Sequence, residues 1–180
     1  GLLVFSGIVI FCFYSFILLK ERLPVEKFGY DAVFFILLIL CFAWGGDTCA
    51  YFAGRAFGKH KLCPVVSPKK TVEGAIGGVL GTMVFGVAAT LIYSIAADRM
   101  EAFTRSNIGV SMYVVIALLA CVAAVLGIYG DLFASVVKRQ CGIKDYGTIF
   151  PGHGGILDRF DSVMFIAPFV TMVITAVFYQ

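Results

Sequence analysis

Five long runs of apolar side chains constrain this chain more than any other feature of its sequence. They cover roughly residues 2–19, 32–57, 74–97, 110–137 and 162–179, with short connections between them. A helix needs about 20 apolar residues to cross the hydrocarbon core of a bilayer, and each run has roughly that length. The sequence therefore predicts an all-α, polytopic integral membrane protein with about five transmembrane helices, some of them broken or extended on the cytoplasmic side.

The composition leads to the same class of protein. The chain is 61% hydrophobic and 14% charged, whereas a soluble domain is about 25% charged. This balance excludes both a soluble globular domain and a disordered chain. No internal repeat interrupts the pattern, so we expect a single transmembrane domain over residues 1–180. The six cysteines form no CxxC pair and are interpreted as small hydrophobic residues.

The basic residues are distributed unevenly between the two sides of the predicted membrane domain. The connections after the second and fourth runs, with the adjoining helix ends, hold nine of them: Arg55, Lys59, Lys61, Lys69, Lys70, Lys138, Arg139, Lys144 and Arg159. The opposite side holds five: Lys20, Arg22, Lys27, Arg99 and Arg105. Because cytoplasmic loops carry an excess of Lys and Arg, we expect the first side to face the cytoplasm.

Two aspartates lie inside the apolar runs, where a charged side chain costs about 2.5–3.5 kcal/mol. Asp131 shares one helix face with Ser135 and Lys138, which follow it by four and seven residues. An ion pair would explain Asp131, and so would a metal or phosphate site facing a water-filled cavity. Asp47 follows a Gly-Gly pair at 45–46, which can let a helix backbone open. It is interpreted either as the cap or ion pair of a new helical segment or as a substrate-site residue.

The segment VSPKKTVEG, residues 66–74, combines a turn with basic side chains. Pro68 resists helix formation, and Ser67 can begin a turn or cap a helix. Lys69 and Lys70 then lie near a helix start, where the helix dipole also favours anions. Such a pair can simply contact lipid headgroups. A carboxylate at Glu73 needs a partner, which favours an organised site.

The densest group of charges occupies residues 138–161. Its basic residues include Lys138, Arg139 and Lys144, and its last two carboxylates are Asp158 and Asp161. The carboxylates are three residues apart, so a helix would place them on one side. Carboxylate oxygens suit Mg²⁺, and basic residues neutralise phosphates. The pattern indicates metal-assisted phosphoryl or nucleotidyl transfer. His153 lies in a Gly-rich loop, where it would bond a backbone carbonyl or donate to a phosphate oxygen.

The third run contains two overlapping GxxxG pairs. Gly74 precedes Gly78 by four residues, and Gly77 precedes Gly81 in the same way. Small residues one turn apart let two helices approach closely. We expect these pairs to serve helix packing, with a dimer contact as the alternative.

The sequence from Ser135 to Asp161 resembles the signature of the phosphatidate cytidylyltransferase (CDP-diacylglycerol synthase) family. Every fixed position of the pattern S-x-x-K-R-x4-K-D-x-G-x4-G-H-G-G-x-x-D-R-x-D is met. Two further stretches resemble motifs of the family, DTCAYFAGR from Asp47 and SPKKTVEG from Ser67. These motifs define a motif-bearing catalytic region over residues 44–161.

The resemblance implies a reaction and its site. CTP and phosphatidate would give CDP-diacylglycerol and pyrophosphate with Mg²⁺, which Asp131 and Asp158 would bind, and a second cation could lie nearby. The catalytic residues implied are Asp131, Asp158, Lys138, Arg139 and Lys144. The substrate-binding residues implied are Asp47, Ser67, Lys69, Lys70, Thr71, Glu73, Ser135, Asp145, His153, Arg159 and Asp161.

The resemblance also implies a setting for the protein. We expect a homodimer in the bacterial inner membrane, with the site facing the cytoplasm and with no nucleic-acid partner. Members of the family carry further hydrophobic segments ahead of the first run, so we expect this chain to lack N-terminal helices of the full-length protein. Two alternatives remain, a CTP-dependent polyprenol or dolichol kinase and an ion-coupled membrane transporter. A transporter would spread its charges through the membrane depth and show a repeat, and neither is seen.

Overall fold

The computed structural model describes residues 2–64, 66–99, 110–143, 145–147 and 155–177. In chain order the elements are α1 (Leu2–Arg22), α2 (Val25–Phe28), α3 (Asp31–Leu40), the π-helical turn η1 (Cys41–Gly45), α4 (Gly46–Phe57), β1 (Lys61–Cys63), β2 (Ser67–Thr71), α5 (Val72–Arg99), α6 (Val110–Gln140), α7 (Leu157–Phe160) and α8 (Val163–Val177). The predicted all-α, polytopic membrane class is confirmed. The short β1–β2 hairpin is the addition that the sequence did not predict.

Within the described residues, three helices are long and apolar enough to cross a membrane. They are Asp31–Phe57, Val72–Ala97 and Ser111–Gln140, and Val163–Ala176 is a shorter apolar helix. Many large apolar side chains on these helices point outward; Leu80 on α5 and Leu118 on α6 are 59% and 64% exposed. Such exposure is expected where the surrounding solvent is lipid. The protein is therefore an integral membrane protein, and the count of five spans stays a prediction.

The second apolar run forms one continuous helix through α3, η1 and α4. Gly45 and Gly46 both keep right-handed helical dihedral angles, so the glycine pair does not open the backbone. The alternative that Asp47 caps a new helical segment is wrong, because the residues before it are already helical and Asp47 lies within the first turn of α4. Instead the chain widens into a π-helical turn just before Asp47. A π turn inserts an extra residue into a helix and rotates the side chains that follow it.

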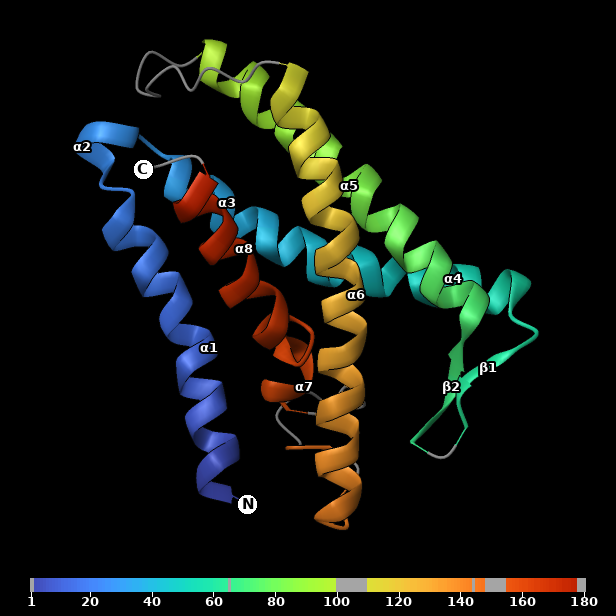
Figure 1. The fold of residues 1–180 in the computed structure, drawn as a ribbon. Coiled ribbons are helices and arrows are strands. Elements are labelled where there is room, and N and C mark those ends of the chain that lie inside the picture. The colour runs from blue at the N-terminus through green and yellow to red at the C-terminus, as the bar shows by residue number, and fades with distance from the viewer. Residues whose placement is uncertain (1, 65, 100–109, 144, 148–154, 178–180) are drawn as a thin grey trace.

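The core lies where four of the helices meet. In Figure 1, α8 lies between α1 and α6, and α3 crosses behind it. Phe35, Leu38 and Phe42 from the α3–η1 helix pack there with Ile116 of α6 and Val170 of α8, and each is nearly or fully buried. The residues that α6 contributes to this core lie in its N-terminal half. Its charged residues Asp131 and Lys138 lie farther along the helix, and Lys138 contacts Asp158 of α7.

Helices α4 and α5 pack closely through small residues. A Cβ atom added at Gly77 would overlap the Cβ of Ala53, and one added at Gly81 would overlap Cys49. Added atoms at Gly74 and Gly78 would likewise meet Ala50. Both GxxxG pairs therefore serve helix packing within the chain, as expected, and this face of α5 is already occupied.

Candidate functional site

Asp131, inside α6, pairs with a lysine from the hairpin. The ammonium group of Lys70 on β2 contacts its Oδ2 atom, and the side chains are 26% and 25% exposed, respectively. The hydroxyl of Ser135 lies 3.4 Å from Oδ1. Lys138 follows Asp131 by seven residues, a rise of about 10.5 Å along a helix, so it cannot reach back to it. The ion pair that the sequence left open is present, but its partner comes from another element.

Asp158, on α7, accepts hydrogen bonds from three donors. Nζ of Lys138 lies 2.8 Å from its Oδ1, and the backbone N–H groups of Tyr146 and Gly155 donate to Oδ2, each at 2.8 Å. Burial by itself would raise the pKa of this carboxyl group. The hydrogen bond from Lys138 and the two N–H donors outweigh burial, so the pKa lies below its usual range. Asp158 is therefore held as a carboxylate.

Asp161 lies on the same side as Asp158, as its spacing predicts. Its Oδ2 is 3.9 Å from Nζ of Lys138, and its Oδ1 accepts the N–H of Ser162 at 2.9 Å. Burial, together with the negative charge of Asp131, raises the pKa of Asp161 to about 7. The charge of Asp47 contributes to the same rise. Asp47, Asp131 and Asp161 therefore lie within electrostatic range of one another.

Asp47 joins this group through a serine that sequence reasoning missed. The hydroxyl of Ser162 donates to Oδ2 of Asp47 at 3.2 Å, and Ser162 is 2% exposed. Both residues line a cavity of about 20 Å³ between the helices, together with Gly46, Gly78 and Thr82. That volume holds about one water molecule and is far too small for a nucleotide. Asp47 thus faces a small cavity whose lining is mostly apolar and does not include Asp131.

The remaining described residues of the predicted site fall into two groups. The Thr71 hydroxyl accepts the N–H of Gly74 at 3.1 Å, so Thr71 caps α5. Glu73 accepts hydrogen bonds from His60 and from the backbone of Lys59, so its partner is the loop after α4. The other group consists of side chains at the surface or partly exposed: Ser67, Lys69, Arg139, Asp145 and Arg159. Lys144 and His153 lie outside the described residues.

Tyr146 and Trp44 hold the site together, and neither was predicted. The Tyr146 hydroxyl donates to the carbonyl of Ala134 at 3.1 Å, and its ring lies 5.2 Å from Nζ of Lys138. Burial, and then the charge of Asp158, raises the pKa of Tyr146 to about 12. The indole N–H of Trp44 donates to the carbonyl of Arg159 at 3.0 Å. Tyr146 lies inside the KDYG stretch, whereas no local signal connects Trp44 to α7.

Mg²⁺ is the metal ion that the sequence predicts for this site. Within the described part of the chain, no three His, Cys, Asp or Glu side chains are grouped so that they could hold a metal ion by themselves. Mg²⁺ usually takes only one or two carboxylates and completes its shell with water and substrate phosphates. Asp131 and Asp158 are carboxylates that already balance a cationic group each, Lys70 and Lys138. Their chemistry fits an ion of that kind.

Comparisons with known proteins agree on one family. A family model described as "Cytidylyltransferase family" matches residues 2–177. The phosphatidate cytidylyltransferase of Bacillus subtilis (strain 168) is 35% identical over 171 residues, which are 94% of this chain and 56% of the relative. That of Staphylococcus haemolyticus (strain JCSC1435) is 39% identical over 144 residues, 80% of this chain and 50% of the relative. That of Staphylococcus epidermidis (strain ATCC 35984) is 42% identical over 140 residues, 78% of this chain and 48% of the relative. The chain thus spans about half the length of these relatives.

Proposed function

The chain belongs to the cytidylyltransferase family, and we propose that it transfers CMP from CTP to phosphatidate. A phosphate oxygen of phosphatidate forms a bond to the α-phosphorus of CTP. The bond between that phosphorus and the oxygen bridging to the β-phosphorus breaks, and pyrophosphate leaves, so that CDP-diacylglycerol is formed. The relatives named phosphatidate cytidylyltransferase support this substrate pair.

The observation that carries the proposal is the alternation of charge at the junction of β2, α6 and α7. Lys70 pairs with Asp131, and Lys138 contacts both Asp158 and Asp161. Carboxylates and ammonium groups interleaved in this way can bind a cation and phosphates together, as a charged nucleotide and a lipid phosphate require. A structural ion pair needs one lysine and one carboxylate, whereas β2, α6 and the α7 turn here contribute two lysines and three carboxylates.

The proposed roles follow from these contacts. Asp131 and Asp158 would bind Mg²⁺, which would neutralise phosphate charge on the nucleotide when bound. Lys70 and Lys138 would exchange their carboxylate partners for phosphate oxygens, a change that keeps each charge balanced. Asp161 is the second carboxylate near Lys138, with Oδ2 3.9 Å from its Nζ. The attacking phosphate oxygen is already ionised, so positioning and charge neutralisation supply most of the catalysis.

The remaining basic and polar side chains are proposed as phosphate or sugar contacts around this centre. They are Ser67, Lys69, Ser135, Arg139, Lys144, Asp145, His153 and Arg159. We also propose that the site faces the cytoplasm from a bacterial inner membrane, because the basic residues gather on one side and the relatives are bacterial. The homodimer stays a prediction, since both GxxxG pairs already pack within the chain.

The test is turnover of labelled CTP by the purified full-length protein with phosphatidate, with and without Mg²⁺. We expect cytidine label in the lipid extract only when Mg²⁺ is present. Asp131→Asn and Asp158→Asn should each abolish it, whereas Glu26→Gln, an exposed carboxylate on α2, should not change it. Full turnover by both aspartate variants would remove the metal-ligand assignment. Transfer of the γ-phosphate to lipid, with release of CDP, would identify a CTP-dependent lipid kinase instead.

A further inference from the structure

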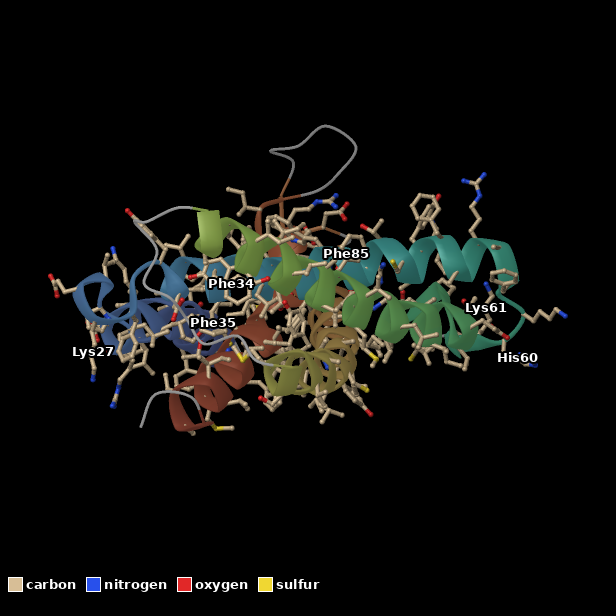
Figure 2. All side chains as sticks on the ribbon, turned by 90° about the horizontal axis from the view of Figure 1, so that it is seen from above. Lys27, Phe34, Phe35, His60, Lys61 and Phe85 are labelled. Carbon is tan, nitrogen blue, oxygen red and sulfur yellow. The ribbon has the colours of Figure 1, made fainter. Side chains whose placement is uncertain are left out.

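The hairpin that carries Lys70 has little regular structure to hold it in place. β1 has three residues and β2 has five, and their antiparallel pairing is irregular between Lys61 and Cys63. A hairpin of two strands alone is at best marginally stable in water. Figure 1 shows it extending from the ends of α4 and α5, and Figure 2 shows His60 and Lys61 at the outer end of that helix pair. Some other contact must position it.

Glu73, in the first turn of α5, supplies that contact. Its Oε2 accepts the backbone N–H of Lys59 at 3.1 Å and that of His60 at 3.2 Å. Its Oε1 lies 2.6 Å from Nδ1 of His60. Because a carboxylate only accepts, Nδ1 is the donor of this bond. The carboxylate of Glu73 therefore holds the chain at the point where it enters β1.

His60 also holds the other strand. Its backbone carbonyl accepts the N–H of Val72 at 3.0 Å, at the junction of β2 and α5. Thr71, beside that junction, is 9% exposed and is enclosed by Gly54, Gly58 and Gly74. Lys70 is the next residue along β2. The backbone on which Lys70 stands is thus fixed by His60 and by Thr71.

We infer that His60 and Glu73 form a clamp that positions Lys70 against Asp131. His60 and Glu73 act as positioning residues. The inference depends on the proposed function for one point, that Lys70 binds a phosphate. The imidazole ring of His60 contacts Glu73 through Nδ1, and the His60 side chain is 78% exposed. Glu73 therefore contributes to the site through the hairpin rather than by touching a substrate.

The clamp is tested first by the chemical reactivity of Lys70, which needs no turnover. An acylating reagent and mass spectrometry report the labelling rate of each lysine in the full-length protein. Lys70 is paired and partly buried, whereas its neighbour Lys69 is exposed and serves as the internal control. We expect His60→Ala to raise the labelling rate of Lys70 at least about threefold and to leave that of Lys69 unchanged. An unchanged rate at Lys70 would overturn the clamp.

A conservative variant separates positioning from general loss of structure. In His60→Asn the side-chain amide can donate to Glu73 from nearly the place of Nδ1. We expect Lys70 labelling and kcat/KM within about twofold of the parent protein in His60→Asn, and a fall in kcat/KM of about tenfold in His60→Ala. An equal defect in both variants would overturn the clamp. If His60→Ala fails to fold, Glu73→Gln, which keeps shape but weakens the charge-assisted bonds, takes its place with the same expected direction.

Lys61→Ala is the matched control on the same hairpin. It removes an exposed positive charge from β1 without touching Glu73, so both readouts should stay at parental values. A tenfold loss there would show that hairpin charge, and not the clamp, controls the site. Should the parent protein give no cytidine-labelled lipid, the proposed function fails. The labelling of Lys70 still decides the clamp in that case.

Discussion

Lys138 and Asp158 form the central ion pair of the site, with Nζ 2.8 Å from Oδ1. The two residues are 20 positions apart and come from the end of α6 and from α7. Their side chains are only 11% and 8% exposed, so this pair is shielded from solvent. The same ammonium group lies 3.9 Å from Asp161. One lysine thus holds the α7 turn, with both of its carboxylates, against α6.

Loss of that lysine should destabilise the protein. Lys138→Met leaves Asp158 buried with two N–H donors but no counter-charge, and breaking a buried pair costs about 3–5 kcal/mol. We expect the low end, about 3 kcal/mol, because the N–H donors remain. Denaturant unfolding in detergent micelles measures this change in the free energy of unfolding. Arg139→Met, at the next and exposed position, should change stability by less than about 0.5 kcal/mol. Equal losses in the two variants would contradict a stabilising role for the pair.

Asp161 should make stability depend on pH. Its pKa is raised from 3.8 to about 7 in the folded protein, mainly by burial and then by Asp131. A carboxyl group with a raised folded pKa contributes stability that is full below pH 3.8 and is lost as the pH rises through about 7. In Asp161→Asn this loss should disappear. We expect the difference in free energy of unfolding between the parent and Asp161→Asn to change by up to about 4 kcal/mol between pH 4 and pH 8. At pH 8 the change favours the variant. Parallel pH profiles, measured with a metal chelator present, would show that Asp161 titrates normally.

Trp44 should support α7 through one hydrogen bond and one ring contact. Trp44→Phe removes the N–H that donates to the carbonyl of Arg159, but it keeps an aromatic ring near Phe160. We expect a loss of about 0.5–1.5 kcal/mol and faster amide exchange in residues 157–160. Trp44→Leu, which also removes the ring contact, should cost more. Identical exchange in the parent and both variants would mean that Trp44 does not support α7.

The contact between α4 and α5 should tolerate a swap of Gly and Ala between facing positions, but not one added methyl group. Gly77→Ala places a methyl group against Ala53 and should cost about 1–3 kcal/mol by overpacking. Adding Ala53→Gly removes the opposing methyl group, so the double variant should recover most of that loss. The helix-propensity changes of the two substitutions, about 1 kcal/mol each, have opposite signs and cancel. Gly7→Ala, with nothing within 4 Å of the added atom, is the control and should be neutral or slightly stabilising. Thermal unfolding measures all three, and an additive double variant would contradict the packing.

The membrane class and the chemistry of the site could be predicted from the sequence because both depend on local pattern. Runs of apolar residues report the solvent around a helix, and carboxylates within them need compensation wherever the helix lies. Asp131 was selected on those grounds, and Asp158 and Asp161 were selected by their helical spacing within the densest group of charges. The structure brings each of the three beside a lysine. The GxxxG packing was predicted in the same way, from residue size and helical spacing.

The partners of those residues could not be predicted, because each comes from a distant part of the chain. Helical spacing grouped Asp131 with Lys138, yet Asp131 pairs with Lys70 and Lys138 turns to α7. A glycine pair such as 45–46 can let a helix open, but both glycines are helical here. The π turn Cys41–Gly45 contains Trp44, whose indole N–H donates to the distant carbonyl of Arg159.

The sequence by itself therefore determined which solvent surrounds this protein and which functional groups its site contains. Only the tertiary structure decided which lysine pairs with which aspartate. It also decided that a hairpin held by His60 and Glu73 positions Lys70 beside Asp131. The physical reason is one of range. Hydropathy and side-chain chemistry belong to single residues and their neighbours in the helix, whereas an ion pair exists only when separate elements pack within a few ångströms of each other.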